Sequence, residues 1–300
     1  MGLLIVNLIY GANYVIAKGL MPDKIGPSGF IFIRVISAVV VFQLVRIALK
    51  QEMIRDKKDI IRLIFCGLFG VAANQLMFFN GLSIGSPINA SIIMVSSPIL
   101  VLVLSAIILK ERLTTVKIAG VIIGCTAAVL FILTNKTLGK GSSWIGDLMV
   151  FFNAMSYGLY LVLVKPLMKK YSPILVISMV FFFGSLFVIP FGWNQFIDVD
   201  WSIWTAGNYY ALAFVVIGVT VLTYVLNLFA LKYVSPTVTS SYIYFQPVIS
   251  SLVAIVGFHY GMNENYADDF SLRKIILALC IFLGVYLVSR PNKTKLKETE

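Results

Sequence analysis

Two stretches of the sequence share one pattern: residues 86–98 read SPINASIIMVSSP, and residues 235–247 read SPTVTSSYIYFQP. Each stretch opens with Ser-Pro, has a serine five residues after its first serine, and reaches a second proline eleven residues after its first proline. The two copies begin 149 residues apart. The predicted fold depends on this repetition.

The composition places the chain in a membrane. Of its residues, 59% are hydrophobic and 12% are charged, and the mean hydropathy is +0.94, whereas soluble domains carry about 25% charged residues. So much apolar surface needs lipid around it. The net charge of +11 does not indicate nucleic-acid binding, because the basic residues lie in short loops between apolar runs and form no patch.

Apolar runs long enough to cross a bilayer, about 20 residues each, recur along the whole chain with short loops between them. The sequence therefore predicts an all-α integral membrane protein. We expect ten transmembrane helices, over residues 2–20, 27–49, 60–82, 86–109, 116–135, 145–166, 173–194, 208–232, 236–259 and 271–290.

The distribution of Lys and Arg predicts the orientation of these helices. If the first residue is cytoplasmic, seventeen of the 24 basic residues lie in cytoplasmic loops and the tail and six lie in outside loops, while Arg34 falls within a span. Cytoplasmic loops carry the excess of Lys and Arg in membrane proteins. We therefore expect both termini in the cytoplasm of a multi-pass plasma-membrane protein, with the bacterial inner membrane as the favoured location.

The repeated stretch opens the fourth predicted span and again the ninth, an offset of five helices. The pair Tyr10-Gly11 recurs as Tyr157-Gly158, and Lys18 recurs as Lys165. Because five is odd, the second copy enters the membrane from the opposite side. Such inverted repeats let one scaffold face either side of a membrane.

The predicted organisation is therefore two inverted five-helix repeats. The first covers residues 1–138, the second covers residues 139–290, and residues 291–300 form a cytoplasmic tail.

The second proline of each copy marks a point where its helix is expected to bend. Ser caps a helix start and Pro fits its first turn, and eleven residues further, about 16 Å along, lies the middle of the bilayer. A proline there removes a backbone hydrogen bond. Pro98 and Pro247 are therefore either packing kinks or hinges beside a wet cavity, and we take them as candidate hinges.

Several motifs together resemble a known family. They are IYGANYVIAK at residues 9–18, Arg34 in the second span, LKERLTTVKIAGVIIG at residues 109–124, and the paired Ser-Pro helices. Over about residues 5–290, this ordered set resembles the drug/metabolite transporter superfamily, and within it the ten-helix EamA-type carriers. The resemblance implies export or exchange of small metabolites, often amino acids or related compounds. It also implies a central cavity lined mainly by helices 1, 3, 4, 6, 8 and 9.

Polar side chains within the spans are the candidates for a solute site, because they are costly in hydrocarbon and usually face the bundle interior or a water-filled path. On the first helix, Tyr10, Asn13 and Tyr14 share one face, with Asn7 a turn below. A single polar residue of this kind can instead form a hydrogen bond between helices without binding solute. Clustered amides and phenols on apolar walls suit a small polar or zwitterionic solute. The predicted substrate-binding residues are Tyr10, Asn13, Arg34, Asn74, Gln75, Ser97, Tyr157, Tyr160, Tyr224, Asn227, Tyr244 and Gln246.

Two interpretations of Arg34 stay open at this point. Its guanidinium group either bonds carbonyls that helix ends leave free, or attracts an anionic group of the solute.

Enzymatic chemistry finds no support in the sequence. The single histidine, His259, and three scattered cysteines form no metal-ligand cluster, and neither G-x-S-x-G nor a phosphate-binding glycine loop occurs. We expect no enzyme, no metal and no cofactor. Every acidic residue lies in a loop or at a helix end, which favours exchange or facilitated diffusion over proton coupling.

The predicted function is secondary transport of a small metabolite by alternating access, in the direction of export. The expected partners are the small-molecule solute and the lipid bilayer, with no nucleic acid, and a homodimer is left open. The alternative is a channel or a membrane interaction protein that transports nothing.

Overall fold

The computed structural model describes residues 2–108, 114–138, 143–234, 239, 242–260 and 271–289. Within these ranges every regular element is helical, and each of the ten predicted spans contains helix. The elements are α1 (Gly2–Lys18), α2 (Pro27–Ala48), α3 (Lys57–Gly67), η1 (Leu68–Ala73), α4 (Asn74–Ile84), α5 (Pro87–Met94), α6 (Ser97–Ile108), α7 (Thr115–Leu138), α8 (Trp144–Lys170), α9 (Pro173–Ile197), η2 (Trp201–Ile203), α10 (Ala206–Ala213), η3 (Phe214–Leu222), α11 (Thr223–Tyr233), η4 (Tyr242–Phe245), α13 (Gln246–His259) and α14 (Leu272–Ser289).

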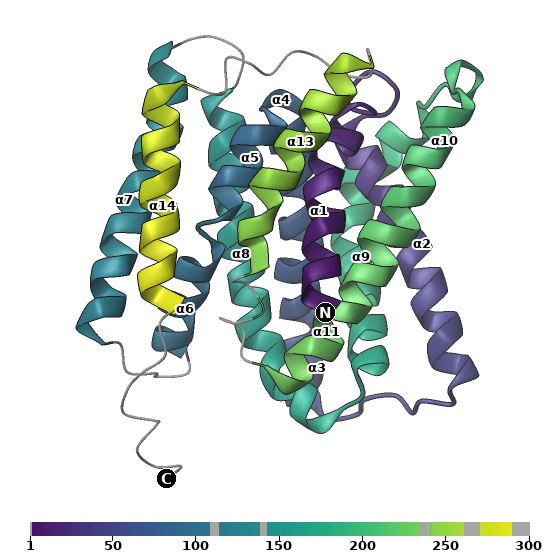
Figure 1. The fold of residues 1–300 in the computed structure, drawn as a ribbon. Coiled ribbons are helices and arrows are strands. Elements are labelled where there is room, and N and C mark those ends of the chain that lie inside the picture. Colours follow the sequence, from purple (N-terminus) through teal and green to yellow (C-terminus); the bar gives the residue numbers. More distant parts are fainter. Residues whose placement is uncertain are drawn as a thin grey trace.

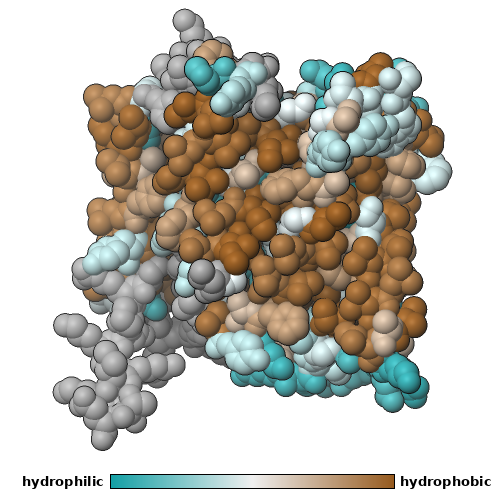
Figure 2. All heavy atoms as spheres, turned by 45° about the vertical axis from the view of Figure 1, so that its right-hand side comes forward, coloured by the Kyte–Doolittle hydropathy of each residue, from teal (hydrophilic) through white to brown (hydrophobic). Residues whose placement is uncertain are grey.

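The prediction of an all-α membrane protein is confirmed. Among the described residues, eight helical stretches are long and apolar enough to cross a membrane, and α1 is a shorter apolar helix. The helices form one bundle, with α7 and α14 paired at one side, and the start of α1 and the end of α14 lie at the same end (Figure 1). On the face shown in Figure 2, a broad apolar band lies between two hydrophilic rims, as lipid requires.

Both repeated prolines stand at breaks in their helices. Ser86 caps α5 by accepting bonds from the backbone N–H groups of Ile88 and Asn89, and the helix is interrupted between Met94 and Ser97, directly before Pro98. In the second copy the 3₁₀ turn η4 gives way to α13 directly before Pro247. The start of that copy, residues 235–238, lies outside the described residues.

Two π-helical segments were not predicted. η1 interrupts the helix made of α3 and α4, and η3 interrupts the helix made of α10 and α11. A π-turn adds one residue per turn and shifts the face that follows it, and such turns occur often at functional sites. Hydropathy does not reveal them, because the extra residue leaves the segment apolar throughout.

Glycines set the closest approach between helices. A Cβ atom on Gly67 of α3 would lie 2.6 Å from the backbone nitrogen of Gly184 and 2.9 Å from the carbonyl oxygen of Val180, both in α9. Backbone atoms cannot turn aside as a flexible side chain can. The contact between α3 and α9 therefore requires a residue without a side chain at position 67.

Gly67→Ala should destabilise the protein, because the added methyl group forces the two backbones apart. Overpacking costs about 1–3 kcal/mol, which lowers Tm by roughly 2–10 °C in thermal denaturation of the detergent-solubilised protein. Gly207→Ala is the matched control, since the nearest atom to its Cβ would be Thr205 Oγ1 at 3.6 Å. Equal melting temperatures for the two variants would contradict the packing argument.

Candidate functional site

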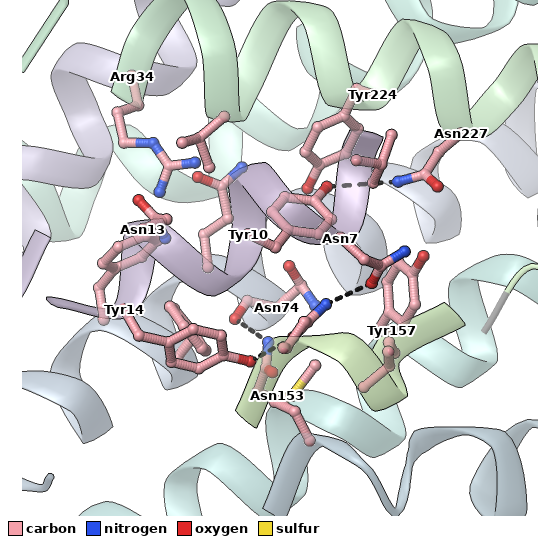
Figure 3. A pocket seen from close by; sticks show the side chains of 18 of the residues that line it. Asn7, Tyr10, Asn13, Tyr14, Arg34, Asn74, Asn153, Tyr157, Tyr224 and Asn227 are labelled. Carbon is pink, nitrogen blue, oxygen red and sulfur yellow. Dashed lines mark hydrogen bonds between the residues drawn. The ribbon is translucent and has the colours of Figure 1, made fainter. Parts of the chain in front are cut away.

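A cavity lies inside the bundle between α1, α2, α4, α8, η3 with α11, and the start of the helix that contains α13. It holds about 670 Å³ of space outside the protein atoms, its opening included. Figure 3 shows amide and phenol side chains from several helices around this space. The lining residues are Val6, Asn7, Tyr10, Asn13, Tyr14, Arg34, Asn74, Gln75, Phe78, Phe79, Met94, Asn153, Tyr157, Val219, Tyr224, Asn227, Thr239, Ile243 and Gln246.

Most of the predicted substrate-binding residues come together in this lining. They are Tyr10, Asn13, Arg34, Asn74, Gln75, Tyr157, Tyr224, Asn227 and Gln246. Because they come from six segments that are distant in the sequence, the shared cavity is a property of the tertiary structure.

Three predicted residues lie outside the lining. Ser97 is fully buried at the start of α6. The ring of Tyr160 fills the space beside Gly70, where a Cβ atom would lie 2.4 Å from the ring. Tyr244 packs on Phe282 of α14, with 6.0 Å between the ring centres. Each was selected because it is polar and lies within a predicted span, and polarity does not determine which neighbouring residue the side chain contacts.

The sequence prediction omitted four polar residues of the lining: Asn7, Tyr14, Asn153 and Thr239. A usable signal existed for the first two, since Asn7, Tyr10 and Tyr14 follow helical spacing on one face. The apolar wall, which includes Phe78 and Phe79, has no signal of its own because apolar residues are frequent throughout the spans.

A chain of hydrogen bonds joins α1 to α13 at the cavity wall. Tyr14 Oη donates to Gln246 Oε1 at 2.7 Å, and Gln246 Nε2 donates to Asn7 Oδ1 at 2.6 Å. Close backbone contact supports the same pairing, since a Cβ atom on Gly11 would lie 2.6 Å from the Cβ of Ile249. These side chains therefore hold the wall together while they face the cavity.

Two tyrosines join helices on the opposite side of the cavity. The hydroxyl groups of Tyr10 and Thr223 lie 3.0 Å apart, and Asn227 Nδ2 donates to Tyr10 Oη at 3.4 Å. Tyr224 Oη donates to the carbonyl oxygen of Gly70 at 3.0 Å. The π-helix η1 is thus bonded to α11 through its backbone.

Arg34 is the one charged residue among the described residues that line the cavity. It is 2% exposed. Its Nε donates to Thr220 Oγ1 at 3.0 Å, and its Cζ lies 4.4 Å from the centre of the Phe79 ring. Nη1 has no hydrogen-bond partner in the described structure. In Figure 3 the guanidinium group points toward the side chain of Asn13.

Several other buried polar atoms of the lining also lack partners within the described structure. They are Asn13 Oδ1, Asn153 Oδ1 and both amide atoms of Gln75. Buried polar groups in proteins are nearly always hydrogen-bonded. Their gathering around one cavity provides donors and acceptors for a bound polar molecule or for water.

Thiol labelling can test which side chains face the cavity. In a background with Cys66, Cys125 and Cys280 replaced by Ser, Asn74→Cys should react with a small water-soluble methanethiosulfonate reagent. Ser97→Cys should react at least about tenfold more slowly, because its thiol is buried away from water and stays protonated. Labelling rates followed by mass spectrometry give the comparison, and faster labelling at position 97 would place the cavity elsewhere.

Comparison with known proteins agrees with this architecture. The EamA-like transporter family matches residues 1–133 and 144–290. An uncharacterized transporter of Bacillus subtilis, YyaM, is 26% identical over 80% of this chain and 76% of its own length. An uncharacterized transporter of Archaeoglobus fulgidus is 26% identical over 78% of this chain and 79% of its own.

Two further matches are more limited. A probable terminal-alkyne amino-acid exporter of Streptantibioticus cattleyicolor is 27% identical over 44% of each chain. A solved crystal structure superimposes with a TM-score of 0.62 at 18% identity, over 96% of this chain and 95% of the other, and so shares the fold. The family match spans nearly the whole chain, and the chain is accordingly a member of the EamA-like transporter family of the drug/metabolite transporter superfamily.

Proposed function

We propose that the chain is a secondary transporter that exports a small polar or zwitterionic metabolite across the plasma membrane by alternating access. The observation that carries this proposal is the cavity between helices of both halves, where buried amide and guanidinium atoms lack a hydrogen-bond partner among the described residues. A relative that matches part of the chain is named an amino-acid exporter, which supports amino acids or related compounds as the solute class.

Alternating access in this proposal rests on ten transmembrane helices arranged as two inverted repeats, residues 1–138 and 139–290. Matched irregularities support it. The third and eighth predicted helices each contain a π-helix, η1 and η3, and the fourth and ninth each break before a proline.

Matched lysines support the same arrangement. Lys18 Nζ donates to the carbonyl oxygen of Ser83 at 2.6 Å, and its counterpart Lys165 donates to that of Leu231 at 2.5 Å. Each lysine therefore holds the end of a helix two positions further along its own half. These matched contacts support the proposed relation between the two halves.

Side-chain contacts join α5 to α13 at the end of the bundle near the end of α1. The hydroxyl groups of Ser91 and Ser250 lie 2.8 Å apart and join α5 to α13. Beside them Val15, Ile88 and Ala254 form a small apolar cluster. In the proposed orientation this is the outer end. A carrier needs contacts of this kind to close one end of the bundle at a time, and these contacts support the proposed carrier.

The cavity also bears on the driving force. The described residues that line it include no Asp or Glu, and these side chains are the usual proton carriers within membranes. The proposal is therefore exchange or facilitated diffusion of the solute.

Removal of cavity amides should weaken transport. We expect Asn13→Ala and Gln246→Ala to lower transport about tenfold each, the loss of roughly 1.4 kcal/mol of binding, because each removes a polar group that lines the cavity. The measurement is efflux from cells, normalised to the amount of protein in the membrane, of the metabolite that accumulates when the gene is deleted.

The control is Ile122→Ala, whose side chain is 61% exposed on the outside of the bundle and should leave transport unchanged. Wild-type transport by both amide variants would show that Asn13 and Gln246 only join helices.

The topology has its own test. Reporter fusions after Glu300 and between Asp198 and Thr205 should place the first in the cytoplasm and the second outside, as the Lys and Arg distribution predicts. The reporters are green fluorescent protein, which fluoresces in the cytoplasm, and alkaline phosphatase, which is active outside. Three predicted spans separate the two fusion sites, so phosphatase activity from both fusions would contradict the ten predicted spans and with them the inverted repeat.

A further inference from the structure

Arg34 is a cation without a counter-ion in the described part of the cavity. Guanidinium groups stay protonated in proteins, and burial of an unpaired charge is costly. The partners that the structure provides are neutral: the hydroxyl of Thr220 and the ring of Phe79. They orient the group and lower the cost of its burial, but they leave its charge uncompensated.

The neighbours of Arg34 occupy its Nε atom and one face of its guanidinium plane, and they leave Nη1 without a hydrogen-bond partner in the described structure. Thr220 Oγ1 donates to the carbonyl oxygen of Val215 in η3 at 2.9 Å, so its lone pairs face Nε of Arg34. Phe79 covers one face of the plane. Nη1 has no hydrogen-bond partner in the described structure, and Arg34 lines the cavity. An unpaired guanidinium N–H group of this kind is the donor that a carboxylate binds.

Asn13 cannot replace the missing anion. Its Oδ1 also lacks a partner in the described structure, and its side chain faces the guanidinium group in Figure 3. An amide oxygen can accept a hydrogen bond from the solute or from Arg34, but it carries no net charge. The Arg34 guanidinium group is therefore paired with an opposite charge only when a bound solute supplies that charge.

We propose that the transported solute carries a carboxylate that pairs with Arg34, and that this pairing makes the chain an obligatory exchanger. The inference rests on the proposed transport function and specifies its solute and its coupling. A carboxylate fits better than a phosphate ester, because the described lining has one cation and a phosphate monoester carries about −1.5 to −2 charges.

Exchange follows from the energy of the empty carrier. To return empty, the carrier must close around the cavity with the Arg34 charge unpaired in a medium of low dielectric constant, which is unfavourable. With a carboxylate bound, the same step encloses the Arg34 guanidinium group as part of an ion pair. Loaded carriers therefore reorient quickly and empty carriers slowly, so solute leaves one side at the rate at which another solute enters.

The experiment uses purified full-length protein in liposomes of phosphatidylethanolamine and phosphatidylglycerol. The probes are matched pairs that differ only in the carboxylate: L-leucine and L-leucinamide, L-phenylalanine and L-phenylalaninamide, and lactate and lactamide. Glycerol 3-phosphate is the phosphate probe. Efflux of each labelled compound is measured into buffer alone and into buffer that contains the same unlabelled compound.

For wild-type protein we expect efflux of carboxylate members but not of their amides or the phosphate. External unlabelled carboxylate should accelerate this efflux at least about tenfold, since the slow empty return is then avoided. This comparison needs no variant, so it decides the proposal even if substitutions at Arg34 prevent folding.

Variants separate the charge of Arg34 from its shape. Arg34→Gln should transport the amides as well as the carboxylates, and the acceleration by external solute should fall toward one, because its empty cavity is neutral. Arg34→Lys keeps the charge and should keep the acceleration, with KM raised about tenfold through loss of the bidentate geometry.

The matched control is Arg46→Gln, which removes a charge from the last turn of the same helix, where Arg46 Nε bonds Gln43 outside the cavity. It should behave as wild type.

The outcomes distinguish the two proposals. If wild type moves the amides or the phosphate as fast as the carboxylates, or moves carboxylates equally fast into buffer alone, transport stands and the role of Arg34 is overturned. If Arg34→Gln keeps both selectivity and acceleration, the role of Arg34 is likewise overturned. If wild type moves none of the probes faster than protein-free liposomes, the proposed function falls together with the inference.

Discussion

Hydrocarbon offers no hydrogen bonds, so every backbone carbonyl that leaves the regular helix pattern must find a donor within the protein. The helix containing η1 shows how this constraint organises the bundle. The carbonyl oxygen of Phe69 accepts from Ser156 Oγ at 2.7 Å, and that of Gly70 accepts from Tyr224 Oη. The carbonyl oxygen of Asn74, just beyond η1, accepts from Asn153 Nδ2 at 2.6 Å.

The donors to these carbonyls come from α8 and α11. The π-helical segment η1 therefore requires donor side chains from α8 and α11 to lie next to its carbonyl groups. Asn74, Asn153 and Tyr224 are also lining residues. The same side chains therefore line the cavity and donate hydrogen bonds to the backbone, or belong to the helix whose carbonyls accept them. A substitution at one of these residues changes both the cavity and the hydrogen bonding of the backbone.

Close helix packing requires small residues, whereas the cavity is lined by larger polar residues, and both kinds lie on the same helix. Gly11 lets α1 approach α13, while Tyr10 and Asn13, its near neighbours in the sequence, face the cavity. A carrier must keep its helices together as it changes shape, and a polar wall by itself gives weak attraction in a membrane. The glycine contacts provide close van der Waals packing where the polar residues leave space for solute.

The fold class could be predicted because its signals are local or periodic. Apolar length defines a membrane helix, and the repeated Ser-Pro pattern locates the breaks before Pro98 and Pro247. Much of the cavity lining was predictable for a similar reason, since polar residues are rare within spans. Two of the predicted residues lie outside the lining because of their neighbours: Tyr160 fills the space beside Gly70, and Tyr244 packs on Phe282.

The sequence by itself therefore determined the membrane environment, the helical segments and a set of polar residues that had to avoid lipid. Only the tertiary structure decided which of those residues meet in one cavity, where the helices become π-helical, and that Arg34 lies there beside Thr220 and Phe79. The physical reason is that hydropathy and spacing indicate only whether a residue avoids lipid or water. Which residue it contacts depends on how each helix is rotated about its axis and at what angle it crosses its neighbours. These properties arise from contacts between residues far apart in the chain.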